Sequence, residues 1–136
     1  MRRELVKLVW ERAGSRCEYC RLSSLDNPDL PFEIDHIIAE KHRGQTRAGN
    51  LCLACFACNR HKGPNVAGVD PKTREIVPLF NPRRHQWQRH FEWDGPILVG
   101  RTSIGRATIG VLKINAPHRI ELRQELIEEA KFPPKH

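Results

Sequence analysis

The spacing of five cysteines constrains the fold of this 136-residue chain more than any other feature. Cys17 and Cys20 form one Cys-x-x-Cys pair, in the stretch SRCEYCRL. A second stretch, LCLACFACNRHK, repeats the spacing with Cys52, Cys55 and Cys58. Two such pairs supply four thiolates, enough for a closed tetrahedral zinc site, and closed sites made only of cysteine are structural rather than catalytic. The sequence therefore predicts one structural zinc ion.

The N-terminal segment supports a metal role for these cysteines. The first residues, MRRELVKLVWERAG, lack the apolar core of a signal peptide, and no stretch of the chain is long enough to span a bilayer. We therefore expect a cytoplasmic chain with no membrane partner. Cysteines in that reducing compartment seldom form a disulfide framework, so either metal binding or simple burial has to explain them.

The triple of cysteines leaves two choices for the second zinc-binding pair. Cys52 follows Asn50 in a short apolar stretch, whereas Cys55 and Cys58 lead into the helical stretch FACNRHK. A Cys-x-x-Cys turn that opens a helix is the usual geometry, which favours Cys55 and Cys58. Cys52 is then expected to be a buried core residue.

An apolar strand with an unusual amount of charge lies between the two cysteine pairs. In PFEIDHII, residues 31–38, apolar residues alternate with Glu33 and Asp35, which is the period of a half-buried strand. Adjacent side chains on a strand point to opposite faces, so Asp35 and His36 can share a site only where the strand ends. We expect the strand to end at about His36, and a loop, a short strand and a helix to follow.

This arrangement resembles the HNH endonuclease family over residues 17–62. The resemblance is carried by EIDHI, Gly44, the Asn50-Leu51 pair and Cys55-x-x-Cys58-Asn59-x-x-Lys62. The three signature positions of the family fall on His36, Asn50 and Asn59, and asparagine at the last position occurs within the family. The resemblance implies a zinc-stapled, treble-clef-like core with a ββα-metal site, in which two antiparallel strands and one helix hold a divalent cation against a phosphate.

The resemblance also implies a role for each of these side chains. Asp35 and Asn59 offer hard oxygen ligands suited to a catalytic Mg²⁺ or Mn²⁺. His36 is the implied general base, since an imidazole is partly neutral near pH 7. Asn50 is expected to hold the loop that orients His36, although an ordinary turn asparagine is the alternative. Glu33 is either a further metal ligand or a neighbour of the ligands.

Basic residues suggest DNA as the partner. The formal net charge is +7, which suits a polyanion. The segment NPRRHQWQRHFEW interleaves cations with aromatic rings, so it can either contact phosphates or pack its rings into a core while its arginines stay exposed. The residues expected to contact DNA are Lys62, Arg83, Arg84 and Arg89.

The rest of the chain predicts a single α+β domain, residues 1–136, with a core at 15–65 and a C-terminal extension at 66–136. A helix is expected over the first twelve residues with Gly14 as its stop, and a turn at residues 70–73. A β-hairpin is predicted around residues 102–105. A last helix is predicted with Asn115 as its N-cap and Pro117 in its first turn, continuing to Ala130 and ending at the prolines at 133 and 134.

Three functions compete for this sequence. The one favoured is a metal-dependent DNA endonuclease with weak sequence specificity, in which His36 activates water. A non-catalytic zinc module that binds nucleic acid would be expected to lack Asp35, His36 or Asn59, and all three are present. A zinc-stabilised protein interaction domain would not need EIDHI.

Overall fold

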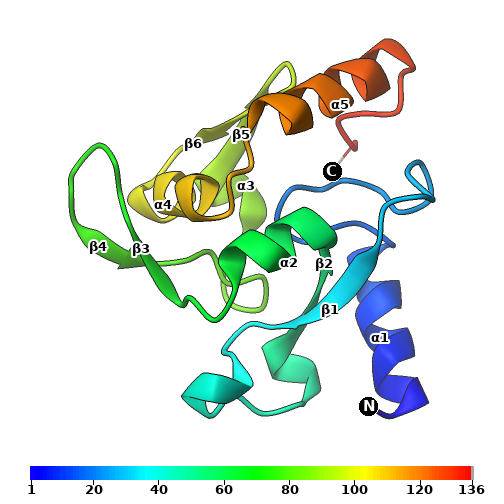
Figure 1. Cartoon of the computed structure of the whole chain (residues 1–136), viewed down its shortest axis with the longest axis vertical. Coiled ribbons are helices and arrows are strands. Elements are labelled where there is room, and N and C mark those ends of the chain that lie inside the picture. Colours follow the sequence, from blue (N-terminus) through cyan, green and yellow to red (C-terminus); the bar gives the residue numbers. More distant parts are fainter. Residues whose placement is uncertain (136) are drawn as a thin grey trace. The chain divides into compact units, whose positions relative to one another are not determined.

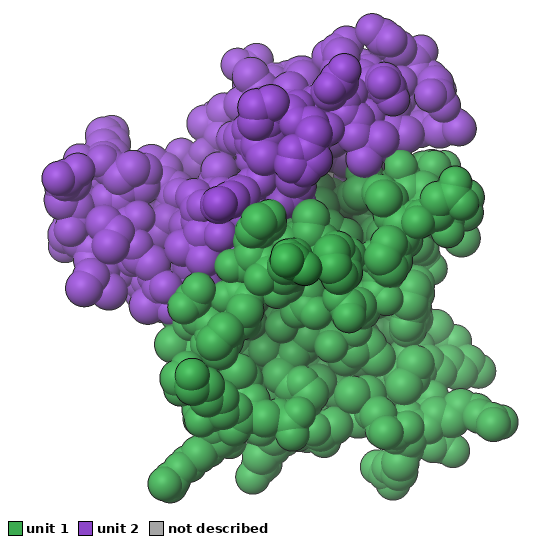
Figure 2. Space-filling view, in the orientation of Figure 1, with its two compact units in different colours: residues 1–66, 81–84 green, residues 67–80, 85–136 purple. Residues whose placement is uncertain are grey.

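The computed structural model describes residues 1–135 and divides the chain into two compact units (Figures 1 and 2). The first unit contains residues 1–66 and 81–84, and the second contains residues 67–80 and the chain from residue 85 onward. Both units combine short strands with helices, so the predicted α+β class is confirmed. Within residues 1–135, no helix is both long and apolar enough to cross a membrane.

The first unit follows the predicted order of strand, loop, strand and helix. Strand β1 (Phe32–His36) ends at His36 as expected, and it pairs antiparallel with β2 (Leu51–Cys55). Helix α2 (Phe56–Lys62) follows β2 directly. The loop between the strands contains two short 3₁₀ helices, η1 (Glu40–His42) and η2 (Ala48–Asn50).

Helix α1 (Arg3–Ala13) covers the apolar side of this hairpin. Val9 packs with Leu51 and Leu53 in a fully buried cluster, because these strand positions share one face. The guanidinium of Arg12 donates to the carbonyls of Ala48 (2.7 Å) and Leu51, which ties the helix to the loop. The helix ends at the predicted Gly14, whose left-handed φ of 61° suits a residue without a Cβ.

The other face of the hairpin carries its charge. Glu33 and Asp35 alternate with the apolar residues of β1, and both contact side chains of α2. The alternation of apolar and charged residues in β1 thus gives the hairpin one face that packs in the core and one charged face that contacts α2.

Up to residue 135, the second unit contains two hairpins and three helices. Strands β3 (Ala67–Val69) and β4 (Ile76–Pro78) form the first hairpin, and β5 (Phe91–Asp94) and β6 (Ile97–Gly100) form the second. The helices are α3 (Trp87–His90), α4 (Ser103–Val111) and α5 (Pro117–Glu128). The buried apolar residues of this unit are Leu79, Phe80, Trp87, Phe91, Leu98, Ala107, Leu112, Ile114, Leu126 and Phe132.

The prediction of a hairpin around residues 102–105 was wrong. The hairpin lies earlier in the chain and is formed by β5 and β6, whereas residues 103–111 form α4. Thr102 caps this helix, because its hydroxyl accepts from the backbone N–H of Gly105 at 3.1 Å. A Cβ at Gly105 would lie 2.1 Å from the carbonyl oxygen of His90, so this glycine permits close packing rather than a turn.

The predicted N-cap and C-terminal end of the last helix were also wrong, whereas Pro117 does lie in its first turn. Ala116 occupies the N-cap position, and Pro117 is the first helical residue. Asn115 instead pairs with the backbone of Leu98, accepting from its N–H at 3.0 Å and donating to its carbonyl at 2.8 Å. The helix ends at Glu128, before Ala130, whose φ of 60° is left-handed.

The predicted turn at residues 70–73 is held by a buried carboxylate. Asp70 is fully buried and accepts two bonds of 2.9 Å from the guanidinium of Arg106 on α4. Its oxygens also accept from the N–H of Lys72 (3.0 Å) and the hydroxyl of Thr73 (2.9 Å). The Arg106 hydrogen bonds, more than any other contact, lower the pKa of Asp70 well below its usual range.

This pair should make the second unit sensitive to acid. The pKa of Asp70 is lower in the folded chain than its value of about 3.9 in an unfolded one. Its stabilisation is therefore complete above about pH 5 and is lost as the pH falls below that. Trp10→Phe leaves Trp87 and Trp93, both in the second unit, as the only tryptophans, and these can be excited selectively over Tyr19. In that background, the free energy of unfolding should be measured by urea titration with fluorescence detection. Between pH 6 and pH 3 it should fall less in the Asp70→Asn variant than in the protein that keeps Asp70. Equal losses would contradict the assignment.

Candidate active site and metal centre

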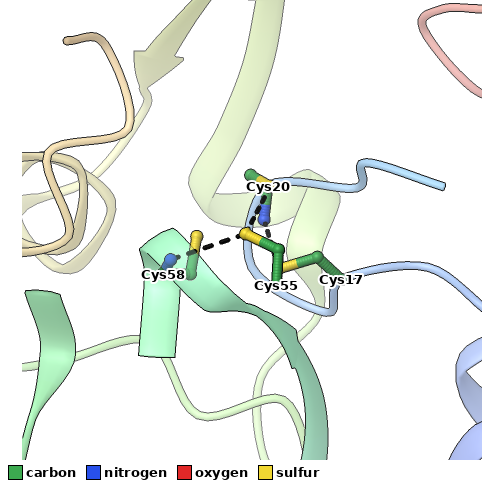
Figure 3. A group of neighbouring side chains, drawn as sticks. All are labelled: Cys17, Cys20, Cys55 and Cys58. Carbon is green, nitrogen blue, oxygen red and sulfur yellow. Dashed lines mark hydrogen bonds between the residues drawn. The ribbon is translucent and has the colours of Figure 1, made fainter. Parts of the chain in front are cut away.

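Four buried cysteines meet where the first cysteine pair faces the junction of β2 and α2. The sulfurs of Cys17, Cys20, Cys55 and Cys58 all lie within 4.8 Å of one another (Figure 3). In a tetrahedral zinc site with bonds of about 2.3 Å, the sulfurs stand about 3.8 Å apart. The Sγ atoms of Cys20 and Cys55 are 3.7 Å apart. The cluster is therefore consistent with the predicted zinc-binding pairs.

The two pairs have matching local geometry. The N–H of Cys20 points to the sulfur of Cys17 at 3.5 Å, and the N–H of Cys58 points to the sulfur of Cys55 at the same distance. Cys55 thereby caps α2. Burial raises the pKa of Cys17 and Cys58 well above the ordinary value. Four thiolates in this place need a cation to compensate their charge.

Cys52 lies outside the cluster, as predicted. Its side chain is buried on β2, with Sγ 3.4 Å from the hydroxyl of Tyr19 and 3.6 Å from Oδ2 of Asp35. Burial, followed by the charge of Asp35, raises the pKa of this thiol. Cys52 is thus a neutral neighbour of the candidate active site.

Asp35 is held inside the protein by a lysine and a tyrosine. Asp35 is only 5% exposed, and its Oδ2 accepts from the hydroxyl of Tyr19 at 2.9 Å. The ammonium of Lys62 lies 3.3 Å from Oδ1 and 3.1 Å from Oδ2, and it also donates to the carbonyl of His36 at 3.1 Å. Lys62 is 1% exposed, so its ammonium forms an ion pair with Asp35 and does not reach the surface.

His36 stands at the end of β1 with its ring partly exposed. Its Nε2 lies 2.8 Å from the hydroxyl of Thr46 and 3.8 Å from a carboxylate oxygen of Glu40. The contact with Thr46 fixes the ring orientation. No sequence motif pointed to Thr46, because it follows His36 by ten residues and lies in a polar loop.

Asn50 closes that loop with its side chain. The amide oxygen accepts from the N–H of Ile38 at 2.8 Å, and the amide nitrogen donates to the carbonyls of Ile38 and Gln45, both at 2.9 Å. A Cβ at Gly44 would lie 1.6 Å from the carbonyl oxygen of Ile38, so only glycine fits this crossing. The side-chain to backbone contact is of the kind expected for Asn50.

One open pocket of about 210 Å³ brings three of the predicted site residues together. Asp35, His36 and Asn59 all line it, with Glu40 beside them. The amide nitrogen of Asn59 donates to Glu33 at 3.2 Å, which leaves its oxygen as the potential ligand atom. His61 does not line this pocket.

The predicted DNA-contacting residues lie in different environments. Arg83 forms an ion pair with the buried carboxylate of Glu18, and Lys62 is buried as described above. Arg84, in the first unit, and Arg89, in the second, are exposed. The rings of Trp87 and Phe91 are buried 5.1 Å apart, as the packing alternative expected.

A second pocket, of about 300 Å³, was missed from the sequence. It lies in the loop between β1 and β2, and no acidic side chain lines it. Gln45 and Arg47 line this basic pocket, while Thr46 between them contacts His36. The run EKHRGQTR was the available signal, since it concentrates cations next to EIDHI. The complete lining consists of Ile38, His42, Arg43, Gly44, Gln45, Arg47 and Asn50.

The fold and the site define a ββα domain with a buried four-cysteine cluster, in which the strand that carries Asp35 and His36 packs against helix α2. In a comparison with protein-family models, residues 17–65 match the model of the HNH endonuclease. The chain thus contains an HNH endonuclease domain, from a family of phosphodiester hydrolases that act on nucleic acid. Searches of curated proteins and of solved structures gave no match.

Zinc should be required for folding of the first unit. Cys17→Ser removes a ligand, and structural zinc contributes about 10–16 kcal/mol to folding in zinc-finger peptides. We expect this variant to lose zinc and to unfold or aggregate. Cys52→Ser is the matched control, because it alters a buried cysteine outside the cluster. Elemental analysis and circular dichroism measure both effects; zinc-free wild-type protein, or equal zinc loss in both variants, would contradict the assignment.

Proposed function

We propose that the chain is a metal-dependent DNA endonuclease, in which His36 is the general base and Asp35 and Asn59 hold one Mg²⁺ or Mn²⁺. The observation that carries the proposal is the pocket that these three side chains share. The nuclease core is proposed at residues 15–65, with residues 66–136 as a C-terminal extension of a single domain. A cytoplasmic location stays a prediction from the sequence.

The oxygen donors fit a hard cation. A carboxylate offers about four lone-pair positions. Tyr19 and Lys62 contact Oδ2 of Asp35. Among the contacts of residues 1–135, only Lys62 is hydrogen-bonded to Oδ1, so this oxygen keeps a lone pair for a cation. Glu33 orients Asn59 by accepting from its amide nitrogen. The cation would supply charge stabilisation to the phosphate and to the departing oxygen.

His36 takes a proton from the attacking water. Thr46 holds Nε2, so the ring keeps one orientation at the edge of the pocket. Asn50 holds Ile38 and Gln45 and thereby the loop that carries Thr46. The base is therefore positioned by its own strand and by the loop that follows.

Phosphate contacts supply most of the DNA affinity in this proposal, and sequence specificity is weak. The basic pocket adds Arg43 and Arg47 to the exposed Arg84 and Arg89 as candidate phosphate ligands. Arg83 fits a packing role better, since its ion pair compensates buried Glu18.

One observation favours a second function, a non-catalytic zinc module that binds nucleic acid. The buried Lys62 already neutralises Asp35, which a module without a catalytic cation would require. Magnesium-dependent nicking of supercoiled plasmid separates the two functions. Binding without any nicking would support the module.

His36→Ala should leave the fold and DNA binding intact. Nicking should fall by about 10²- to 10⁴-fold, the usual contribution of a general base. Plasmid nicking and a separate binding assay measure the two properties. Nicking near the wild-type rate would exclude His36 as the base.

Asn59→Ala should abolish magnesium-dependent nicking, because it removes a proposed ligand. His61→Ala is the matched control on the same helix, two residues further and thus about 200° around the axis. It should have little effect on nicking. If His61→Ala is inactive while Asn59→Ala still cuts, the assignment of the helix face is wrong.

Arg43→Gln combined with Arg47→Gln should weaken binding to all DNA sequences about equally. Each lost phosphate contact lowers the slope of log affinity against log salt by about 1, so the double variant should lose about 2. Arg2→Gln combined with Arg3→Gln removes the same charge from exposed residues outside the pocket. Fluorescence anisotropy across a salt series measures the DNA affinity and the salt slope of both double variants. Equal effects in the two variants would attribute the loss to net charge rather than to the pocket.

A further inference from the structure

Tyr19 connects the four-cysteine cluster to the candidate active site. It lies between Cys17 and Cys20, is fully buried, and donates from its hydroxyl to Oδ2 of Asp35 at 2.9 Å. The only tyrosine of the chain therefore lies next to the cysteine cluster and contacts Asp35, which follows it by sixteen residues in the sequence.

The segment that carries Tyr19 is fastened to β2 by its neighbour Glu18. The N–H of Glu18 donates to the carbonyl of Leu53 at 2.8 Å, and the carboxylate of Glu18 accepts from the N–H of Leu53 at 2.9 Å. Asp35 on β1 pairs with Cys52, which lies on β2 next to Leu53. The Tyr19 hydroxyl is thus presented to Asp35 from a fixed backbone.

The hydroxyl constrains which carboxylate oxygen remains for a cation. Tyr19 and Lys62 approach Oδ2, and Cys52 lies 3.6 Å from the same atom. Oδ1 is contacted by Lys62 at 3.3 Å. Without the Tyr19 bond, the carboxylate could rotate and exchange its two oxygens.

We propose that Tyr19 is a positioning residue that orients Asp35 with Oδ1 toward the cation, and so makes catalytic-metal affinity depend on the cysteine cluster. This inference rests on the proposed function, in which Asp35 is a metal ligand. Hydrogen-bond partners of metal ligands typically change affinity by about 10- to 100-fold when they are removed.

The first test measures Mn²⁺ affinity of the full chain by isothermal titration calorimetry. Tyr19→Phe keeps the ring and removes the hydroxyl, and it should weaken Mn²⁺ binding about 10- to 100-fold while zinc content stays unchanged. High Mn²⁺ should restore much of the nicking rate. Ser23→Ala is the matched control, because it removes a buried hydroxyl that accepts only from the nearby backbone N–H groups of Leu25 and Asp26 in the described contacts. It should bind Mn²⁺ as the wild type does.

Asp35→Ala separates failure of this inference from failure of the proposed function. If Asp35→Ala loses Mn²⁺ binding and Tyr19→Phe binds as the wild type does, the positioning role is overturned and the proposed metal site stands. If wild type and Asp35→Ala bind Mn²⁺ equally, both the metal site and this inference are overturned.

A second measurement does not depend on a folded Tyr19→Phe variant. Fluorotyrosine incorporated into the chain labels Tyr19 alone, because there is no other tyrosine. Its ¹⁹F resonance should shift on addition of Mg²⁺ in the wild-type sequence and should not shift in Asp35→Ala. A resonance that stays fixed while Mg²⁺ supports nicking would overturn the inference.

Discussion

The four-cysteine cluster is the constraint on which the first unit depends. It joins residues 17–20 to the point where β2 ends and α2 begins, and Cys55 also caps that helix. The position of α2 in turn brings Asn59 to Glu33 and Lys62 to Asp35. A 7-residue helix has little stability of its own. Its ability to present ligands therefore comes from the cluster and from the strand beneath it.

The second constraint is the buried charge of Asp35. Burying a carboxylate is costly unless it is paired and hydrogen-bonded, and Lys62 and Tyr19 supply both. Removing one partner of such a pair typically costs about 3–5 kcal/mol. Lys62 is therefore a structural requirement of the strand as well as a neighbour of the pocket. The sequence position of Lys62, three residues after Asn59, placed it on the correct helix face, but its burial could not be inferred from spacing.

Local patterns with one clear physical cause were predictable from the sequence. The period of two in EIDHI predicted the strand, and the need for Asp35 and His36 to share a site predicted its end at His36. Cys-x-x-Cys spacing predicted the cluster, and the helical stretch after Cys55 excluded Cys52 from it. Gly14 and the turn at residues 70–73 were readable from residue chemistry. The pocket residues Asp35, His36 and Asn59 followed from the family resemblance.

Features decided by tertiary contacts were not predictable. SIGRATIGV contains two glycines and several β-branched residues, which disfavour a helix locally. It becomes α4 because Thr102 caps it, Gly105 packs on His90 and Arg106 meets Asp70. Thr46 and Arg83 likewise owe their roles to distant partners. Asn115 has the chemistry of an N-cap, but the backbone of Leu98 takes its side chain instead.

The Lys62–Asp35 pair also bears on how a cation and DNA would bind together. A divalent cation at Oδ1 of Asp35 would stand near the ammonium of Lys62, and two cations in a poorly solvated place repel each other. One carboxylate cannot compensate three positive charges. A phosphate entering the pocket would add one further negative charge beside His36 and Asn59. In the proposed site, the cation would therefore bind more tightly once the substrate phosphate is present, and metal and DNA binding would be reciprocally coupled.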